Sequence, residues 1–359
     1  MIDGDAYLPV TTNPAYVTAT MPDDDSSTFP TALIIDEDAG TNWDSSTASF
    51  VSGLANDCSD MQITLADGET TVPFGVEKIS QVPGSRALVV HIGIRSLSAS
   101  VGTELLLWRG VGGGPYEDKA GVYPASDGWW LSLPMNDTGV SVANWADSGY
   151  EFEKDDVDAV IPTDGVVDGG QLFDDGAVYC GDFRILDQCT TLQWVYPYAT
   201  NVDMTVYAHH YYSYALGIRS GNWAYNNVWG LWIPGHSAVA NTWSLVGLSL
   251  NKPDLIVYSW DPTNGWRQSY REHDRAIGTH TSIGEAAWGA GNWQGIIDGA
   301  RAREPGQSND WLLTTAQLEY YNDAFWTIGE EVLLATRSPN ARRRMSYRLG
   351  PSLFMGGIL

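Results

Sequence analysis

Short apolar runs separated by turn-forming residues constrain the fold of this chain most. Runs rich in Val, Ile, Leu, Thr, Tyr and Trp alternate with clusters of Gly, Pro, Asn and Asp. Residues 87–94 and 104–108 are typical of buried strands, and 242–250 with 255–260 predict an antiparallel pair. The turn signal Asp-Pro-Thr-Asn-Gly follows at 261–265. Many strands with a turn about every 8–12 residues favour antiparallel sandwiches over a parallel sheet. We therefore predict an all-β fold.

Helical spacing is scarce, and one segment carries it clearly. Residues 309–322 place apolar side chains at helical intervals, and Ser308 or Asn309 can cap the first turn. The residues that recur at this spacing are Trp311, Leu312, Thr315, Leu318 and Glu319. We predict a single well-formed helix there, close to the end of the second domain.

The charge of the chain is large and unevenly distributed. Its 359 residues hold 44 Asp and Glu against 19 Lys and Arg, a net charge of −25. Residues 331–359 contain five arginines and one acid, so residues 1–330 carry −29 and the last segment +4. The five are Arg337, Arg342, Arg343, Arg344 and Arg348. An acidic body repels phosphate-rich partners, so we expect it to bind neither nucleic acid nor membrane.

The basic segment 331–359 also contains two prolines and ends in the apolar sequence Leu-Phe-Met-Gly-Gly-Ile-Leu. We expect it to form an extended C-terminal arm. Its opposite charge favours docking of the arm onto an acidic neighbouring subunit, which predicts a homo-oligomer. Weak local binding of nucleic acid and a disordered arm are the alternatives.

The first residues, Met-Ile-Asp-Gly-Asp, resemble no secretory signal, and no run reaches the roughly 18 apolar residues that cross a bilayer. The three cysteines, at 58, 180 and 189, form no Cys-x-x-Cys motif. A disulfide framework is therefore not expected, although a pair between 180 and 189 stays open. We expect the chain to fold in a reducing cytoplasm.

The sequence 67–77, Asp-Gly-Glu-Thr-Thr-Val-Pro-Phe-Gly-Val-Glu, precedes the strand 87–94, and the strand 104–108 runs into Arg109-Gly110. This order resembles a small β domain of unknown function that is often fused before laminin-G-like domains. The resemblance implies an N-terminal β-sandwich domain over residues 1–115. The glycine-rich segment 110–114 then serves as the connection to the next domain.

Four later stretches match motifs of a second family, and they occur in the same order along the chain. They are 128–133 (Gly-Trp-Trp-Leu-Ser-Leu), 167–176, 241–246 (Asn-Thr-Trp-Ser-Leu-Val) and 295–301 with the predicted helix. They resemble the laminin-G-like, concanavalin A-like jelly roll. The resemblance implies a jelly roll over residues 116–330, followed by the arm at 331–359. Alternation in 241–246 turns Trp243 and Leu245 to the same face of a sheet.

Glycoside hydrolysis needs two carboxylates about 5–9 Å apart on one cleft. The acidic stretch 151–158 offers the closest spacing, in Glu151 and Glu153. The resemblance places this stretch in a loop, so we interpret it as a solvated acidic loop and expect no catalytic activity. Neither a nucleophile motif nor a phosphate-binding loop is present.

Laminin-G-like domains sometimes hold a calcium ion at one rim, and carboxylate oxygens are its usual ligands. Asp174, Asp175 and Asp298 are the candidates here. The alternative is that these residues only brace turns, since no Asp-x-Asp-x-Asp-Gly loop occurs. We expect no obligatory cofactor and leave calcium open.

Aromatic residues are the strongest candidates for binding. Eleven Trp or Tyr lie between residues 194 and 232. Rings with polar edges stack on sugars and anchor protein interfaces, whereas most rings of a sandwich belong to its core. Rings beside Gly and Asn are predicted to lie in exposed loops and to bind ligand. These are Trp223, Tyr225, Trp229 and, separately, Trp266.

Together these patterns predict a non-enzymatic binding or structural protein. Domains of the two families usually occur in exported proteins, yet the chain shows no signal. A tailed-phage virion component, assembled in the host cytoplasm and released by lysis, fits both facts. We expect a capsid decoration, tail or host-adhesion role, with neighbouring virion subunits and surface glycans as partners. The alternatives are a secreted or cell-surface carbohydrate-binding protein and a glycoside hydrolase of concanavalin A-like fold.

Overall fold

The computed structural model describes residues 2–334, apart from positions 3, 20, 22–27, 168, 181–187, 210–213, 228–231, 252, 273–280 and 286–290. The five arginines of the predicted arm therefore lie outside the described residues. The helices are η1 (Pro14–Tyr16), α1 (Ser45–Gly53), α2 (Lys119–Val122), η2 (Ala125–Asp127), α3 (Asn309–Tyr320) and α4 (Asn322–Phe325). Among the residues described, none of these helices has the length and apolar character that crossing a bilayer requires.

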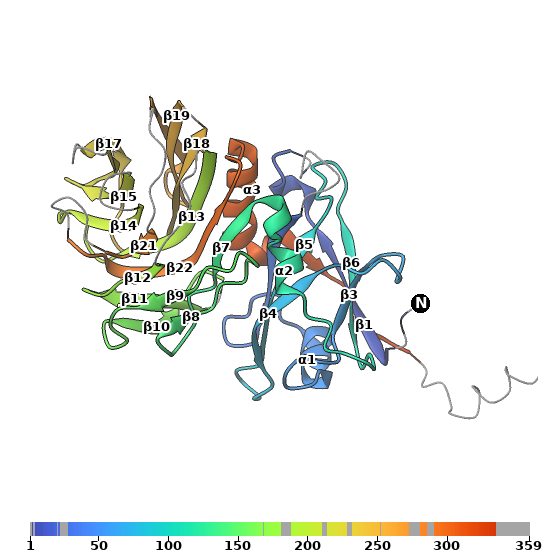
Figure 1. The fold of residues 1–359 in the computed structure, drawn as a ribbon. Coiled ribbons are helices and arrows are strands. Elements are labelled where there is room, and N and C mark those ends of the chain that lie inside the picture. The colour runs from blue at the N-terminus through green and yellow to red at the C-terminus, as the bar shows by residue number, and fades with distance from the viewer. Residues whose placement is uncertain are drawn as a thin grey trace, which may run out of the picture.

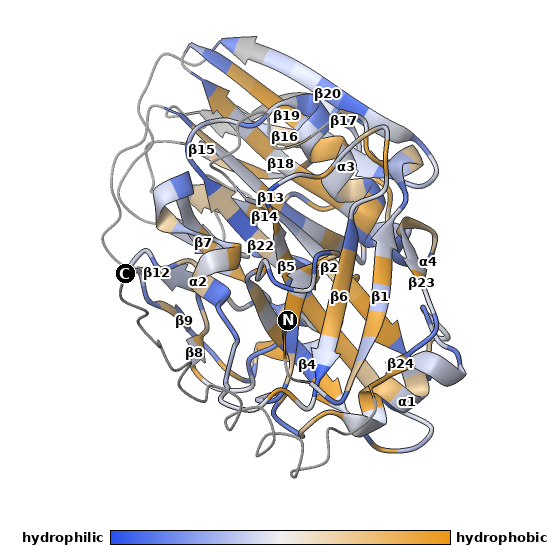
Figure 2. Ribbon diagram, turned by 90° about the vertical axis from the view of Figure 1, so that its right-hand side faces the viewer, coloured by the Kyte–Doolittle hydropathy of each residue, from blue (hydrophilic) through white to orange (hydrophobic). Residues whose placement is uncertain are grey.

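Two sheets form an N-terminal sandwich. Sheet 1 contains β1 (Ala6–Thr12), β3 (Gln62–Leu65), β6 (Glu104–Arg109), β23 (Trp326–Ile328) and β24 (Val332–Leu333). Sheet 2 contains β2 (Phe29–Asp36), β5 (Ala87–Ile94) and β4 (Phe74–Ser80). Side chains of both sheets share one buried cluster, and Figure 2 shows the apolar residues that run along β1 and β6.

Two larger antiparallel sheets form the second sandwich. Sheet 3 contains β7 (Trp129–Leu133), β10 (Val160–Asp164), β11 (Gly169–Asp174), β13 (Gln188–Pro197), β18 (Ser244–Asn251), β19 (Asp254–Asp261), β20 (Gly265–Glu272) and β22 (Gln294–Arg303). Sheet 4 contains β8 (Ser141–Val142), β9 (Phe152–Lys154), β12 (Val178–Cys180), β14 (Met204–His209), β15 (Tyr214–Arg219), β16 (Asn222–Asn227), β17 (Trp232–Ser237) and β21 (Thr281–Ile283). Their facing sides bury a second core. The predicted all-β fold, a β-sandwich followed by a jelly-roll sandwich, is confirmed.

Local signals placed several elements correctly. The predicted pair around residues 251–254 is the β18–β19 hairpin, and Asp261 ends it by accepting hydrogen bonds from the backbone of Thr263 and Asn264. The predicted helix is α3, and its first turn is capped by Ser308, whose hydroxyl accepts from the backbone N–H of Trp311. All three cysteines are buried.

The chain returns to its beginning after the jelly roll. Helix α3 stands between sheet 3 and the N-terminal sandwich (Figure 1), and it leads the chain through α4 into β23 and β24. Both strands pair with β1, in the registers Val10 to Ile328 and Tyr7 to Val332. We predicted that the jelly roll would extend to residue 330, but the strand from 326 to 328 completes sheet 1 of the first sandwich.

Candidate binding surfaces

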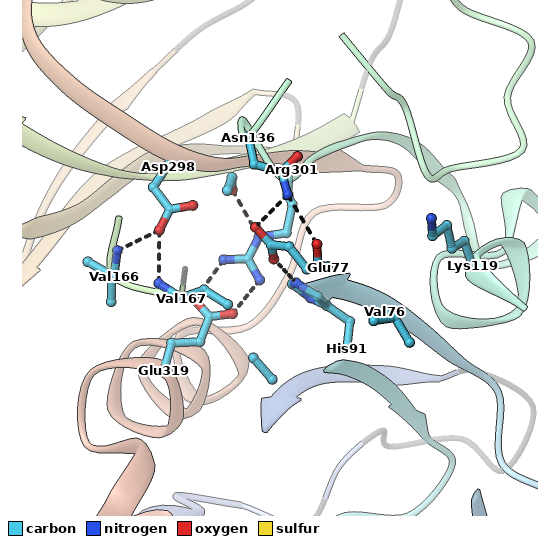
Figure 3. A network of polar contacts seen from close by, with 12 residues as sticks. Val76, Glu77, His91, Lys119, Asn136, Val166, Val167, Asp298, Arg301 and Glu319 are labelled. Atoms are coloured by element: carbon cyan, nitrogen blue, oxygen red, sulfur yellow. Dashed lines mark hydrogen bonds and ion pairs between the residues drawn. The ribbon is translucent and has the colours of Figure 1, made fainter. Parts of the chain in front are cut away.

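A buried polar network joins the two sandwiches (Figure 3). In the N-terminal sandwich, His91 lies between two partners: Glu77 is 2.6 Å from its Nε2 and the Tyr123 hydroxyl is 2.9 Å from its Nδ1. On the jelly-roll side, the guanidinium of Arg301 donates to both carboxylate oxygens of Glu319, at 2.5 and 2.8 Å. Asn136 donates to the Glu77 carboxylate at 3.4 Å, and residues from both sides line one small cavity, so β4, β5, β22 and α3 meet at this point.

Asp298 belongs to the same region. Its Oδ2 accepts hydrogen bonds from the backbone N–H groups of Val166 and Val167, at 2.7 and 2.9 Å. Burial raises the pKa of Asp298 well above its usual value, and the nearby charge of Glu77 adds to this effect. Asp298 therefore braces the turn before β11, as the alternative to calcium binding predicted.

The network contains acid–base groups but no room for a substrate. Glu77, His91, Tyr123, Asp298 and Arg301 surround a cavity of about 10 Å³. Such a volume holds about one water molecule. The cavity is therefore too small for a sugar or a peptide, and the network is part of the contact between the two sandwiches.

The predicted calcium ligands do not come together. Asp174 pairs with Gln294 across β11 and β22, whereas Asp298 lies four residues further along β22. At about 3.3 Å per strand residue, this separates the two backbone positions by roughly 13 Å along the strands. Asp175 instead bonds to Asn292. The predicted three-aspartate site is therefore wrong, and no described group of three His, Cys, Asp or Glu residues can hold a metal ion.

Two of the predicted ligand-binding rings are core residues. Trp223 and Tyr225 lie on β16 with 0% and 2% exposure, and Trp223 stacks on Trp293 with ring centres 6.3 Å apart. The neighbouring Ser220 and Gly221 have φ values of 50° and 78°, which is a two-residue hairpin turn rather than an exposed loop. The predicted exposure of these rings is therefore wrong. Trp229 lies outside the described residues.

Trp266 is the predicted ring that reaches a surface. It is half-buried on β20 and stacks on Tyr258, with ring centres 5.3 Å apart and an angle of 18° between the planes. Across sheet 3 it pairs with Trp260, which in turn pairs with Leu245. Paired residues share a face of a sheet. Trp266 therefore lies on the outer face of sheet 3, away from the jelly-roll core.

Other aromatic rings gather on this outer face. Tyr196 lies 5.4 Å from Trp243 and 6.1 Å from Tyr198, measured between ring centres. Tyr198 is 47% exposed, and Tyr320 at the end of α3 is 36% exposed. Tyr320 packs 5.2 Å from the buried ring of Trp260. We name this surface the aromatic face and define it by Tyr196, Tyr198, Trp243, Trp266 and Tyr320.

Tyr196 and Tyr198 belong to the eleven Trp and Tyr residues between 194 and 232, but neither was predicted to bind ligand. The signal that could have found the surface is alternation. Trp194 and Tyr196 share a face of β13, and Trp243 and Leu245 share a face of the chain entering β18. The predicted common orientation of Trp243 and Leu245 is confirmed, since both pack on the outer side of sheet 3.

The edge strand β17 of the jelly roll contains a half-buried histidine. His236 of β17 hydrogen-bonds through Nε2 to the hydroxyl of Ser259 on β19. Burial lowers the pKa of His236 to about 4, and the nearby Arg267 acts in the same direction. In the unfolded chain this histidine binds a proton near pH 6.5. Its contribution to the free energy of unfolding should therefore be fully present above pH 6.5 and be lost as the pH decreases toward 4.

We expect His236→Gln to flatten this acid dependence. His236 is only partly buried, so solvent screening reduces the expected contribution to on the order of 1–2 kcal/mol. Urea denaturation of both proteins at pH 7, 5.5 and 4.5 measures the difference between their profiles. Parallel profiles would contradict a role for His236, since carboxylates elsewhere titrate in both proteins.

No known family model and no curated protein matches the chain. Three of the solved structures that resemble the chain have TM-scores between 0.38 and 0.42. Domain 4 of AbnA, a GH43 extracellular arabinanase from Geobacillus stearothermophilus solved with arabinotriose, is 13% identical over 53% of this chain and 98% of that domain, with a TM-score of 0.42.

The other two structures are longer than the matched region. The binding domain of botulinum neurotoxin serotype D is 12% identical, with a TM-score of 0.38 and 55% and 52% coverage of this chain and that one. A Trypanosoma rangeli sialidase mutant displaying trans-sialidase activity is 11% identical, with a TM-score of 0.41 and 70% and 44% coverage. The chain spans about half the length of each.

Proposed function

We propose that this chain is a non-enzymatic glycan-binding protein and that the aromatic face is its binding surface. The observation that carries the proposal is a group of neighbouring Trp and Tyr rings on one side of sheet 3. Tyr198 and Tyr320 are exposed, and Tyr196, Trp243 and Trp266 are half-buried. A contiguous exposed aromatic surface usually serves as an interaction site. Its rings are held by strand pairing and by α3, so little conformational entropy is lost when a ligand stacks on them.

The chemistry of the aromatic face suits a sugar. Aromatic rings offer flat apolar area, and the hydroxyls of Tyr198 and Tyr320 add polar edges. Asn241 and Gln268 are exposed beside Trp243 and Trp266, and their amides can donate to and accept from sugar hydroxyls. Apolar ring faces combined with amide groups favour a neutral carbohydrate over a phosphate-rich ligand.

We further propose a location for this glycan-binding protein: it belongs to a virion, as a capsid decoration, tail or host-adhesion component. Two features support it. The hydrogen bond from Asn136 to Glu77 and the cavity lined from both sides connect the two sandwiches, and the acidic body of −29 keeps copies apart unless a specific contact joins them. A secreted or cell-surface glycan-binding protein would use the aromatic face in the same way. Cosedimentation with purified particles distinguishes the two locations.

Catalysis by the acidic stretch is the remaining alternative. Glu153 is exposed on the short strand β9, and Glu151 lies just before it. Successive strand residues point to opposite faces, so Glu151 and Glu153 share the face opposite the buried ring of Phe152. Reducing-sugar release from a polysaccharide panel, lost in Glu153→Gln, would overturn the non-enzymatic proposal.

A glycan array with the full chain tests the proposed function. We expect binding to at least one neutral glycan and a loss of about tenfold in affinity, about 1.4 kcal/mol, for Tyr198→Ala or Trp266→Ala. Tyr179→Ala is the matched control, because Tyr179 is 45% exposed but lies on β12 of sheet 4. An equal loss in the control, or no bound glycan, would contradict the proposal.

A further inference from the structure

A line of apolar side chains continues the aromatic face across sheet 3. The strands β10, β11, β22 and β13 follow one another in this sheet (Figure 1). Ile161 of β10 pairs with Leu172 of β11, which pairs with Ile296 of β22. Ile296 pairs in turn with Tyr196 of β13, whose ring lies 5.4 Å from that of Trp243. Directly paired residues lie on the same face of a sheet. We name these five residues the cross-strand row.

The neighbours of these residues along each strand show which face the cross-strand row occupies. The adjacent residues that belong to the jelly-roll core are Val160, Phe173, Ile297 and Val195. Successive strand residues point to opposite faces, so the cross-strand row points away from that core. Ile161 is 43% exposed, and the other four side chains of the row are half-buried. The row therefore offers apolar surface over four strand spacings, roughly 19 Å.

A line of polar groups runs beside the cross-strand row. Asp174 pairs with Gln294 across β11 and β22, and the backbone carbonyl of Gln294 accepts a hydrogen bond from the N–H of Tyr198 at 3.3 Å. The backbone N–H of Asn241 donates to the last residue of β13. All four side chains are exposed, and we name them the polar rim. Asp174 and Gln294 each lie two positions from a member of the cross-strand row, so the rim shares the outer face of sheet 3.

The cross-strand row and the polar rim together suit one kind of ligand. The row supplies apolar surface for the faces of sugar rings, and the rim supplies amides and a phenol that donate to and accept from hydroxyls. Asp174 is the single charged residue of the two lines. We infer that the ligand of the aromatic face is a linear chain of several neutral sugars that lies across β10, β11, β22 and β13. This inference rests on the function proposed above and adds Ile161, Leu172 and Ile296 to the binding surface.

Other occupants fit this surface less well. A peptide binds a sheet chiefly by pairing with an open strand edge, whereas β11, β22 and β13 are each paired on both sides. A second copy of the chain would bring a further acidic body of −29 toward Asp174, and the phosphates of a nucleic acid would be repelled in the same way. A chain of sugars carries its own hydroxyls and needs side-chain partners alone, which the polar rim provides.

The length of the cross-strand row favours a chain over a single sugar. One sugar ring is about as large as one aromatic side-chain ring, so it contacts a small part of the row. Each further sugar reaches the side chain of another strand. Strand pairing already holds these side chains in place, so the added contacts require little ordering of the protein. Affinity should therefore rise with chain length until the row is covered.

Isothermal titration calorimetry of the full chain tests this inference. The probes are linear oligosaccharides of glucose, xylose, mannose and arabinose, each supplied as the single sugar and as chains of increasing length. We expect the affinity for at least one series to rise tenfold or more from the single sugar to the longer chains. Ile161→Ser combined with Leu172→Ser should remove most of this gain and leave the affinity for the shortest bound chains unchanged. Ile161→Ser alone, at an exposed position, should remove part of the gain without disturbing the fold.

Val82→Ser with Val101→Ser is the matched control, because these side chains are 63% and 68% exposed but belong to the N-terminal sandwich. This variant should bind every chain as the unsubstituted protein does. The inference is overturned if single sugars and chains bind equally, or if the control loses as much long-chain affinity as the row variants. Should Tyr198→Ala still weaken binding in that case, the function proposed above stands. Absence of binding to every sugar would overturn both.

Discussion

Replacing Arg301 with Met is expected to lower the free energy of unfolding by about 3–5 kcal/mol. Arg301 and Glu319 are 4% and 1% exposed, and the guanidinium donates to both oxygens of the carboxylate. The substitution leaves a buried carboxylate whose remaining partner is the indole N–H of Trp194, at 2.7 Å. Urea denaturation at pH 7, followed by tryptophan fluorescence, measures the loss.

The exposed pair between Arg219 and Asp203 is the matched control. These side chains are 36% and 32% exposed and 3.0 Å apart, so Arg219→Met should cost less than about 1 kcal/mol. The double variant Arg301→Met with Glu319→Gln should recover part of the loss, because it removes the uncompensated charge. Equal effects of Arg301→Met and Arg219→Met would mean that burial does not make this pair important.

Asn322→Ala has the second-largest expected effect, about 1–3 kcal/mol of unfolding free energy. The Asn322 amide accepts from the backbone N–H of Ile34 at 3.0 Å and donates to the backbone carbonyl of Ala32 at 2.7 Å. Both groups lie on the edge of β2 that faces away from β5, where none of the described strands pairs. Truncation removes the partner of the buried Ile34 N–H, whereas the Ala32 carbonyl still accepts from the indole N–H of Trp326 at 2.8 Å.

The same denaturation experiment measures this loss, with Asn292→Ala as the matched control. Asn292 is a half-buried amide that bonds the backbone carbonyl and the carboxylate of Asp175 at 2.8 and 2.9 Å, near solvent. Water can replace these bonds, so the control should cost less than about 1 kcal/mol. A small effect of Asn322→Ala would show that the edge of β2 is hydrated or that other side chains replace the amide.

Local chemistry made part of this structure predictable. The β18–β19 hairpin follows from alternating apolar residues on both sides of a turn, and α3 follows from the Ser308 cap and helical spacing. Both elements depend on neighbours within about 20 residues. The pairing of β1 with β23 depends on residues more than 300 positions apart, and no local signal specifies it.

The candidate site was harder to predict for the same reason. A tight hairpin turn and an exposed loop share the same Gly and Asn composition, so Trp223 was assigned to a surface that it does not reach. The aromatic face needs the register of three strands and the end of α3, which composition cannot supply. The network around His91 likewise unites residues of both sandwiches.

The pairing of β23 and β24 with β1 also sets an order of events during synthesis. Sheet 1 contains residues 6–12, yet one edge of β1 has no strand beside it until residues 326–333 have left the ribosome. The jelly roll, whose strands all come earlier, can close first. The nascent N-terminal sandwich meanwhile exposes an unpaired strand edge, the feature through which chains aggregate. Completion of the first domain therefore waits for the translation of the last described strands.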